Sequence, residues 1–149
     1  MYQMIKSDWV EIKDFCPEEF GAEDMSTRLI YTMQDMRNYV GRRINVHSGY
    51  RPGRTGYHPL KMAADIDIVG LDVIDQYLIA EKFDALNGIG VYPFWNNQGI
   101  HVDVRPRSKL MIDSRWGCFE AGKYVKLDSK FFRRINSRTV HELRRGGKL

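Results

Sequence analysis

The sequence is poor in cysteine. Its 149 residues include only Cys16 and Cys118, which lie far apart and have no C-x-x-C spacing. Neither a disulfide framework nor a cysteine-based metal cluster is therefore indicated. With 43% hydrophobic residues, the chain can form one core without covalent cross-links. We predict a single domain over residues 1–130, followed by a basic tail over 131–149, and we expect a monomer.

A long apolar run is also absent. No stretch approaches the roughly 20 residues needed to cross a bilayer. The first fifteen residues, MYQMIKSDWVEIKDF, carry charges throughout and lack the apolar centre of a signal peptide. These absences predict a product made in the cytoplasm without a signal peptide and without a membrane partner.

Acidic residues are scarce at the C-terminus. The segment RRINSRTVHELRRGGKL carries six Arg or Lys against a single acid, Glu142. Nucleic acid or another anionic polymer could bind such a segment. It has no aromatic residues interleaved with the basic ones for stacking on bases. We therefore interpret it as a solvated helix with a frayed end, and we do not expect nucleic acid as a partner.

The apolar periodicity predicts an α+β fold. Ser26 or Thr27 can cap a helix whose apolar residues recur every three or four positions up to Val40. A second helix is predicted over residues 71–86. The segments 43–49, 62–70 and 99–107 alternate as strands do, whereas NGIGVYPFWNNQG is rich in turn residues. This order predicts a small, mostly antiparallel sheet with flanking helices.

Polar side chains share one face of two predicted strands. Successive side chains of a strand point to opposite faces, and apolar residues occupy the other face of both segments. A polar face of this kind is costly unless it lines a polar site. The residues on it are Asp65 and Asp67 in the first strand and His101, Asp103 and Arg105 in the second.

These residues suit a catalytic zinc site. Such a site needs three ligands drawn from His, Asp or Glu, with one position left open for water. If Asp65 and His101 face each other across the sheet, His58 from the Gly/Pro-rich loop at 50–59 completes the set. Zinc would polarise a peptide carbonyl and lower the pKa of its water towards about 7. Nothing in the spacing alone excludes a structural hydrogen-bond network that joins Asp65, Asp67, His101 and Asp103.

Five short motifs follow one another along the chain. They are SGYRP, H-x6-D from His58 to Asp65, GIGVYP, HVDVR and SRWG. Together they resemble the M15 family of zinc peptidases, in the branch of D-alanyl-D-alanine carboxypeptidases and phage endolysins. The resemblance implies a hedgehog-like fold, Zn²⁺ as cofactor, and His58, Asp65 and His101 as its ligands. It also implies that the substrate is a peptidoglycan stem peptide and that the activity is that of a D,D-carboxypeptidase or an endopeptidase. Such an enzyme would act on the cell wall after release or as a virion component.

The resemblance extends to residues around the ligands. It implies that Arg51 lies near the substrate, where its guanidinium could pair with a carboxylate or a developing oxyanion. Bracing of the loop is the alternative role for this arginine. Tyr50 and Tyr92 fall within the matched motifs and could contact substrate as walls of the cleft, and aromatic packing explains them equally well.

The sequence departs from the family pattern at three positions. Gly56 stands where many members have Ser, and Lys61 where they have Gly. Several branches carry a carboxylate as general base three residues before the last ligand, where this chain has Gln98, and an amide cannot take a proton from water. Asp103 is the natural substitute, or it could instead accept a hydrogen bond from the free imidazole N–H of a ligand. Gln98 motivates the alternative function, a non-catalytic zinc-binding phage structural or assembly protein.

Overall fold

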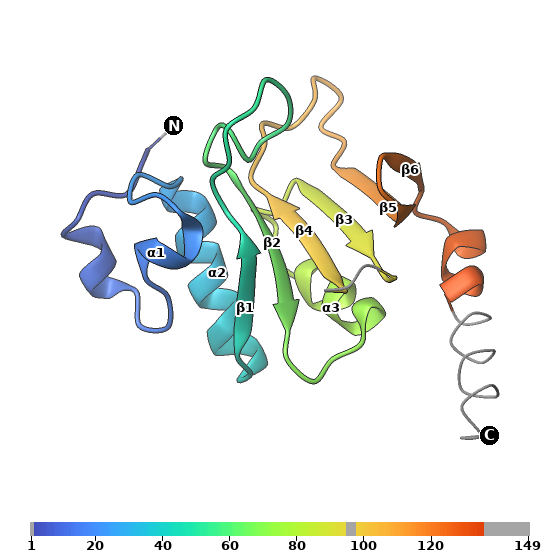
Figure 1. Cartoon of the computed structure of the whole chain (residues 1–149), viewed down its shortest axis with the longest axis horizontal. Coiled ribbons are helices and arrows are strands. Elements are labelled where there is room, and N and C mark those ends of the chain that lie inside the picture. The colour runs from blue at the N-terminus through green and yellow to red at the C-terminus, as the bar shows by residue number, and fades with distance from the viewer. Residues whose placement is uncertain (1, 95–97, 136–149) are drawn as a thin grey trace.

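A computed structural model describes residues 2–94 and 98–135 of the chain. They form one mixed sheet of six strands with helices packed on one of its faces (Figure 1). The elements are η1 (Asp8–Glu11), α1 (Pro17–Phe20), α2 (Thr27–Val40), β1 (Ile44–Ser48), β2 (Ala63–Ile68), α3 (Val73–Ala80), β3 (Gly88–Tyr92), β4 (Gly99–Asp103), β5 (Ser114–Glu120) and β6 (Lys123–Lys126). The predicted α+β class is confirmed.

The strands lie in the order β1-β2-β4-β3-β5-β6. Four neighbouring pairs are antiparallel, and β3 pairs with β5 in parallel. The predicted antiparallel majority is confirmed, but the sheet is larger than expected because β3, β5 and β6 were not predicted. Gly88 and Gly90 give β3 the composition of a turn. They are needed in the strand because a Cβ at either position would overlap a neighbouring side chain.

The helices α2 and α3 lie behind the sheet in Figure 1. The predicted cap of α2 is confirmed, since the Ser26 hydroxyl accepts a hydrogen bond from the backbone N–H of Leu29 at 3.4 Å. The helix buries an apolar stripe made by Leu29, Ile30, Met33 and Met36. The second helix, α3, is shorter than the predicted 71–86, because the chain leaves it through i→i−3 turns at Lys82 and Phe83.

The packed domain extends past the predicted boundary at residue 130. Residues 129–135 are helical, and Phe131 and Ile135 are 3% and 6% exposed within the core. Phe131 lies over Gly117 of β5, where any side chain would collide with its ring. The start of the predicted basic tail is therefore part of the core, and the remainder, 136–149, lies outside the described residues.

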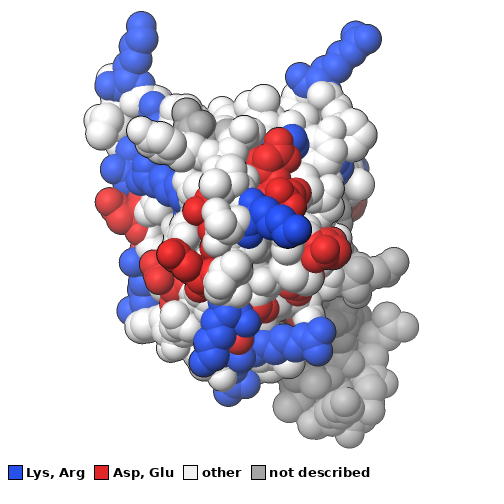
Figure 2. Space-filling view, turned by 90° about the vertical axis from the view of Figure 1, so that its left-hand side faces the viewer, with Lys and Arg blue, Asp and Glu red and all other residues white. Residues whose placement is uncertain are grey.

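The N-terminal segment closes one end of the core. Trp9 and Phe15 contact the ring of Phe20 at centroid distances of 6.0 and 5.8 Å. On this side of the molecule, Lys and Arg side chains are interspersed with Asp and Glu (Figure 2). No helix in the described part of the chain is long and apolar enough to span a bilayer.

Candidate metal centre

One row of residues crosses the sheet on the face opposite the helices. The backbone register pairs Ser48 with Asp65, Asp65 with His101, His101 with Gly90, and Gly90 with Trp116. The side chains of Asp65 and His101 consequently meet, with 3.0 Å between Asp65 Oδ1 and His101 Nδ1. Strand alternation predicted that both side chains lie on polar faces, and the register of β2 with β4 brings them together.

His58 joins this pair from the loop between β1 and β2. Its Nε2 lies 3.3 Å from Asp65 Oδ1, and its ring centroid is 5.0 Å from that of His101. Both imidazoles are buried, whereas the Asp65 carboxylate is partly exposed. One ligand atom from each of the three residues lies within 4.8 Å of the other two. This buried His-Asp-His set could hold a metal ion.

The hydrogen bonds of His58 show that its Nε2 suits a metal ion. Its Nδ1 lies 2.7 Å from the carbonyl oxygen of Gly49, which can only accept, so Nδ1 carries the proton. In the neutral ring, Nε2 then presents a lone pair. That atom is buried and has no hydrogen-bond partner among the described residues. A lone pair held 3.3 Å from a carboxylate oxygen is unfavourable unless a cation lies between them.

The N-terminal segment fixes the carbonyl that orients His58. The backbone N–H of Tyr50 donates to the carbonyl of Phe20 at 2.7 Å. A Cβ at Gly49 would lie 2.5 Å from the same oxygen, so only glycine allows this close approach. Packing of Phe20 in the core thereby places the Gly49 carbonyl beneath the imidazole of His58.

Asp103 orients the second imidazole. Its Oδ2 lies 2.7 Å from His101 Nε2, which must therefore carry the proton and leave Nδ1 to face Asp65. Arg105 donates to the same carboxylate through Nε at 2.8 Å and Nη2 at 2.7 Å. The Asp103 side chain is 0% exposed. Of the two roles predicted for Asp103, this geometry favours the hydrogen bond to His101 over proton transfer with a water in the cleft.

The charges around His101 favour its protonation in the metal-free protein. Burial alone would raise the pKa of Asp65, but the hydrogen bond to His101 and the nearby imidazole of His58 hold that pKa well below its usual range. Burial is likewise outweighed at Asp103, whose pKa is lowered by Arg105 and His101. Burial lowers the pKa of His101, yet its bonds to Asp103 and Asp65 raise it overall. A metal ion could therefore replace a proton between two ionised carboxylates.

An aromatic cluster supports Arg105. Its guanidinium lies over the rings of Tyr57 and Trp116, at 4.4 and 5.1 Å from their centroids. The indole N–H of Trp116 donates to the hydroxyl of Tyr92 at 3.0 Å, and burial raises the pKa of Tyr92. Sequence reasoning missed this support for Asp103. The sequence Gly88-Ile89-Gly90 could have indicated it, because Gly88 leaves space for the carboxylate of Asp103 on the polar face of the sheet.

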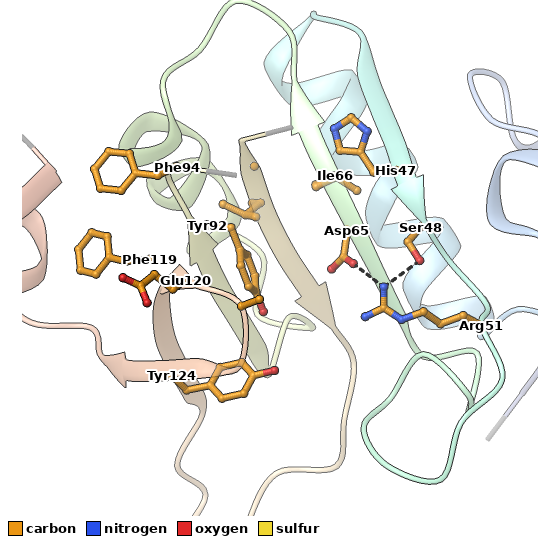
Figure 3. Close-up of a pocket in the computed structure, with 13 residues that line it drawn as sticks. His47, Ser48, Arg51, Asp65, Ile66, Tyr92, Phe94, Phe119, Glu120 and Tyr124 are labelled. Carbon is orange, nitrogen blue, oxygen red and sulfur yellow. Dashed lines mark hydrogen bonds and ion pairs between the residues drawn. The ribbon is translucent and has the colours of Figure 1, made fainter. Parts of the chain in front are cut away.

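Arg51 lies beside the three candidate ligands. Its Nη1 donates to Asp65 Oδ2 and to Ser48 Oγ, both at 3.2 Å (Figure 3). The side chain is 57% exposed. The sequence placed this arginine near the site, and the structure brings it into direct contact with Asp65.

Two cavities flank the candidate centre. The larger, of about 580 Å³, is lined by residues that include His47, Ser48, Asp65, Phe94, Phe119 and Glu120 (Figure 3). The smaller, of about 470 Å³, is lined by residues that include Gly53, Thr55, Tyr57, His58, His101 and Trp116. Arg51, Tyr92 and Tyr124 line both. Tyr92 thus lines the walls of both cavities, and its contact with substrate stays a prediction.

Two other residues singled out in the sequence lie apart from the cavities. Tyr50 is not among the described residues that line either one, and Lys61 lies over its ring at 5.2 Å. Gln98 is exposed just before β4 and does not line them either. Lys61 adopts a left-handed φ of 60°. Glycine would adopt that backbone conformation at less cost than lysine.

Comparisons of the chain with models of protein families, with curated proteins and with solved structures find no match. The interpretation of the centre therefore depends on its own donor atoms and on the motifs around them.

Proposed function

We propose that the chain is a zinc metallopeptidase of the M15 type, with a hedgehog-like fold, that hydrolyses peptide bonds in peptidoglycan stem peptides. The observation that carries this proposal is the convergence of His58, Asp65 and His101 within 4.8 Å beside open cavities. Two imidazoles and one carboxylate form a donor set typical of catalytic zinc, with a position left for water or substrate. The five motifs add the substrate class.

The chain's own groups would hold zinc through His58 Nε2, Asp65 Oδ1 and His101 Nδ1. When bound, zinc would act as a Lewis acid on the scissile carbonyl and activate water at neutral pH. The Gly49 carbonyl and the Asp103 carboxylate fix which nitrogen of each imidazole faces the ion. Both rings are held before a metal arrives, which keeps the site ready to bind.

Arg51 supplies the cation on the substrate side. Its Nη1 makes the bonds to Ser48 and Asp65, while Nε and Nη2 have no partner among the described residues. These N–H groups can donate to a substrate carboxylate, or to the carbonyl oxygen as it gains charge during hydrolysis. The bond to Asp65 keeps the guanidinium next to the reacting bond.

A second function is favoured by a specific observation: among the described residues, neither predicted candidate for the base is free beside the ligands. Gln98 is an exposed amide, and the carboxylate of Asp103 is enclosed by its bonds to His101 and Arg105. A non-catalytic zinc-binding phage structural or assembly protein would have this arrangement, since it needs the metal but no proton transfer.

Purified protein with one equivalent of zinc, incubated with peptidoglycan, separates the two functions. We expect soluble fragments with new amino groups, detected by mass spectrometry. The His58→Ala, Asp65→Ala and His101→Ala variants should each lose zinc and activity. Stoichiometric zinc without cleavage under a broad range of conditions would support the non-catalytic function and refute the peptidase.

A further inference from the structure

The two cavities are halves of one cleft that meet at the candidate metal centre. Asp65 lines only the larger, whereas His58 and His101 line only the smaller. Along the strands, the larger extends towards Gly99 and the smaller towards Arg105, on opposite sides of the row formed by Asp65 and His101. A chain lying in the cleft would therefore continue past the centre in both directions.

The larger half is built into the sheet by two bulges. The register shifts at His47 in β1 and at Phe119 in β5. A bulge puts two residues of one strand opposite a single residue of its neighbour and turns the strand locally. As a result, the consecutive pairs His47–Ser48 and Phe119–Glu120 line facing walls of this half (Figure 3).

Both halves are too large for a single terminal alanine. Their volumes, about 580 and 470 Å³, each fall in the range of ~300–1,000 Å³ typical of pockets for whole ligands. The methyl side chain of alanine would leave most wall atoms of either half without a contact, and unfilled apolar space forfeits binding energy. Phe94 and Phe119, stacked at 5.4 Å in the larger half, offer apolar surface to longer side chains.

Among the described residues, neither far end of the cleft offers a cation for a terminal carboxylate. Arg51 stands at the junction of the two halves. Arg105 lines the smaller half, but Asp103 already binds its guanidinium through two hydrogen bonds. Among the described residues that line the two halves, these are the only Arg or Lys side chains. A substrate that extends to either far end therefore meets no free cation there among the described residues, which suits a chain that continues without a terminal carboxylate.

We propose that the cleft binds an internal segment of a peptide, so that the chain is an endopeptidase and not a carboxypeptidase. This inference rests on the proposed function. Hydrolysis adds the oxygen of one water to the carbonyl carbon and breaks the C–N bond, and the departing nitrogen takes a proton. Cleavage within a chain therefore leaves a new carboxylate on one peptide and a new amine on another, whereas a carboxypeptidase releases a free amino acid.

The zinc-loaded full chain should be incubated with purified muropeptides, both monomers that end in D-Ala-D-Ala and cross-linked dimers. Liquid chromatography with mass spectrometry then identifies each product. We expect two peptide fragments from each cleaved molecule and no free alanine. Free alanine as the sole product would overturn the inference while leaving the peptidase intact. No hydrolysis of any muropeptide, with zinc bound, would refute the proposed function and this inference with it.

Two variants test occupation of both halves. Thr55 lines the smaller half and Ala121 the larger, and both are exposed. Thr55→Trp and Ala121→Trp should each lower kcat/KM for the cleaved muropeptide by about tenfold or more, because a displaced substrate loses its reactive geometry. Leu78→Trp, at a 54% exposed position on α3, is the matched control. Loss of activity in only one of the two variants, or in neither, with zinc content unchanged, would contradict an internal segment lying across the centre.

Discussion

Replacing Asp103 by Asn tests how the candidate centre is held. The substitution keeps the shape of the side chain but removes the charge that accepts from His101 Nε2 at 2.7 Å and from Arg105 at 2.7 and 2.8 Å. Loss of an outer partner of a metal ligand typically weakens metal binding by about 10- to 100-fold, or roughly 1.4–2.7 kcal/mol. The complete burial of Asp103 favours the upper part of that range, since water cannot replace the lost charge.

Competition for zinc with a chromophoric chelator measures this change. Asp84→Asn is the control, because Asp84 also pairs with an arginine, Arg107 at 2.8 Å, but is 92% exposed and away from the centre. We expect its zinc affinity to equal that of the unmodified chain. If Asp103→Asn bound zinc as tightly as the control and lost only turnover, Asp103 would be the general base and the positioning role would be wrong.

Three further predictions follow from the same contacts. Because the pKa of His101 is raised in the metal-free protein, zinc should displace a proton from this ring, and its affinity should increase as the pH rises towards that pKa. Calorimetry in buffers of different ionisation enthalpy would detect the released proton. Gly90→Ala places a Cβ 2.5 Å from the Trp116 ring and should cost about 1–3 kcal/mol in urea unfolding, whereas Gly53→Ala, at 3.4 Å from Pro59, should cost less. The pKa of Asp103 is lower in the folded, metal-free protein than in the unfolded chain, where it is near 3.8, so ionised Asp103 stabilises the fold above that pH. The free energy of unfolding should therefore fall as the pH drops below about 4, and it should fall less steeply in Asp103→Asn.

Alternation predicted the strands that carry the site but not the whole sheet. β2 and β4 have apolar residues at every second position, and in the structure these residues are buried on the face of the sheet that packs against the helices. β3 does not show this pattern, because Gly88 and Gly90 occupy the positions that would carry polar side chains. β5 pairs in parallel with β3, a contact between distant parts of the chain that no local pattern specifies.

Within the site, period two predicted that Asp65 and His101 lie on polar faces, but it does not specify which residue of β1 lies beside Asp65. Strict alternation from the pair Val46 and Ile66 would place His47 opposite Asp65. The bulge at His47 shifts the register by one residue, so Ser48 takes that place. This shift lets Ser48 accept a hydrogen bond from Arg51. The loop and the motif resemblance indicated His58, but not its exact position, which depends on the contact of Gly49 with the N-terminal segment.

The sequence left open a structural hydrogen-bond network as the alternative to a metal site. Such a network needs a hydrogen-bond donor for each buried acceptor atom. His58 Nε2, His101 Nδ1 and Asp65 Oδ1 converge with their lone pairs facing one another. A proton on His101 Nδ1 satisfies one contact, and Arg51 donates to the other oxygen of Asp65. No described residue donates to His58 Nε2. While His58 is neutral, a network of protein groups therefore leaves this buried nitrogen without a partner, at a cost of about 1–3 kcal/mol, whereas a cation among the three atoms satisfies all of them together.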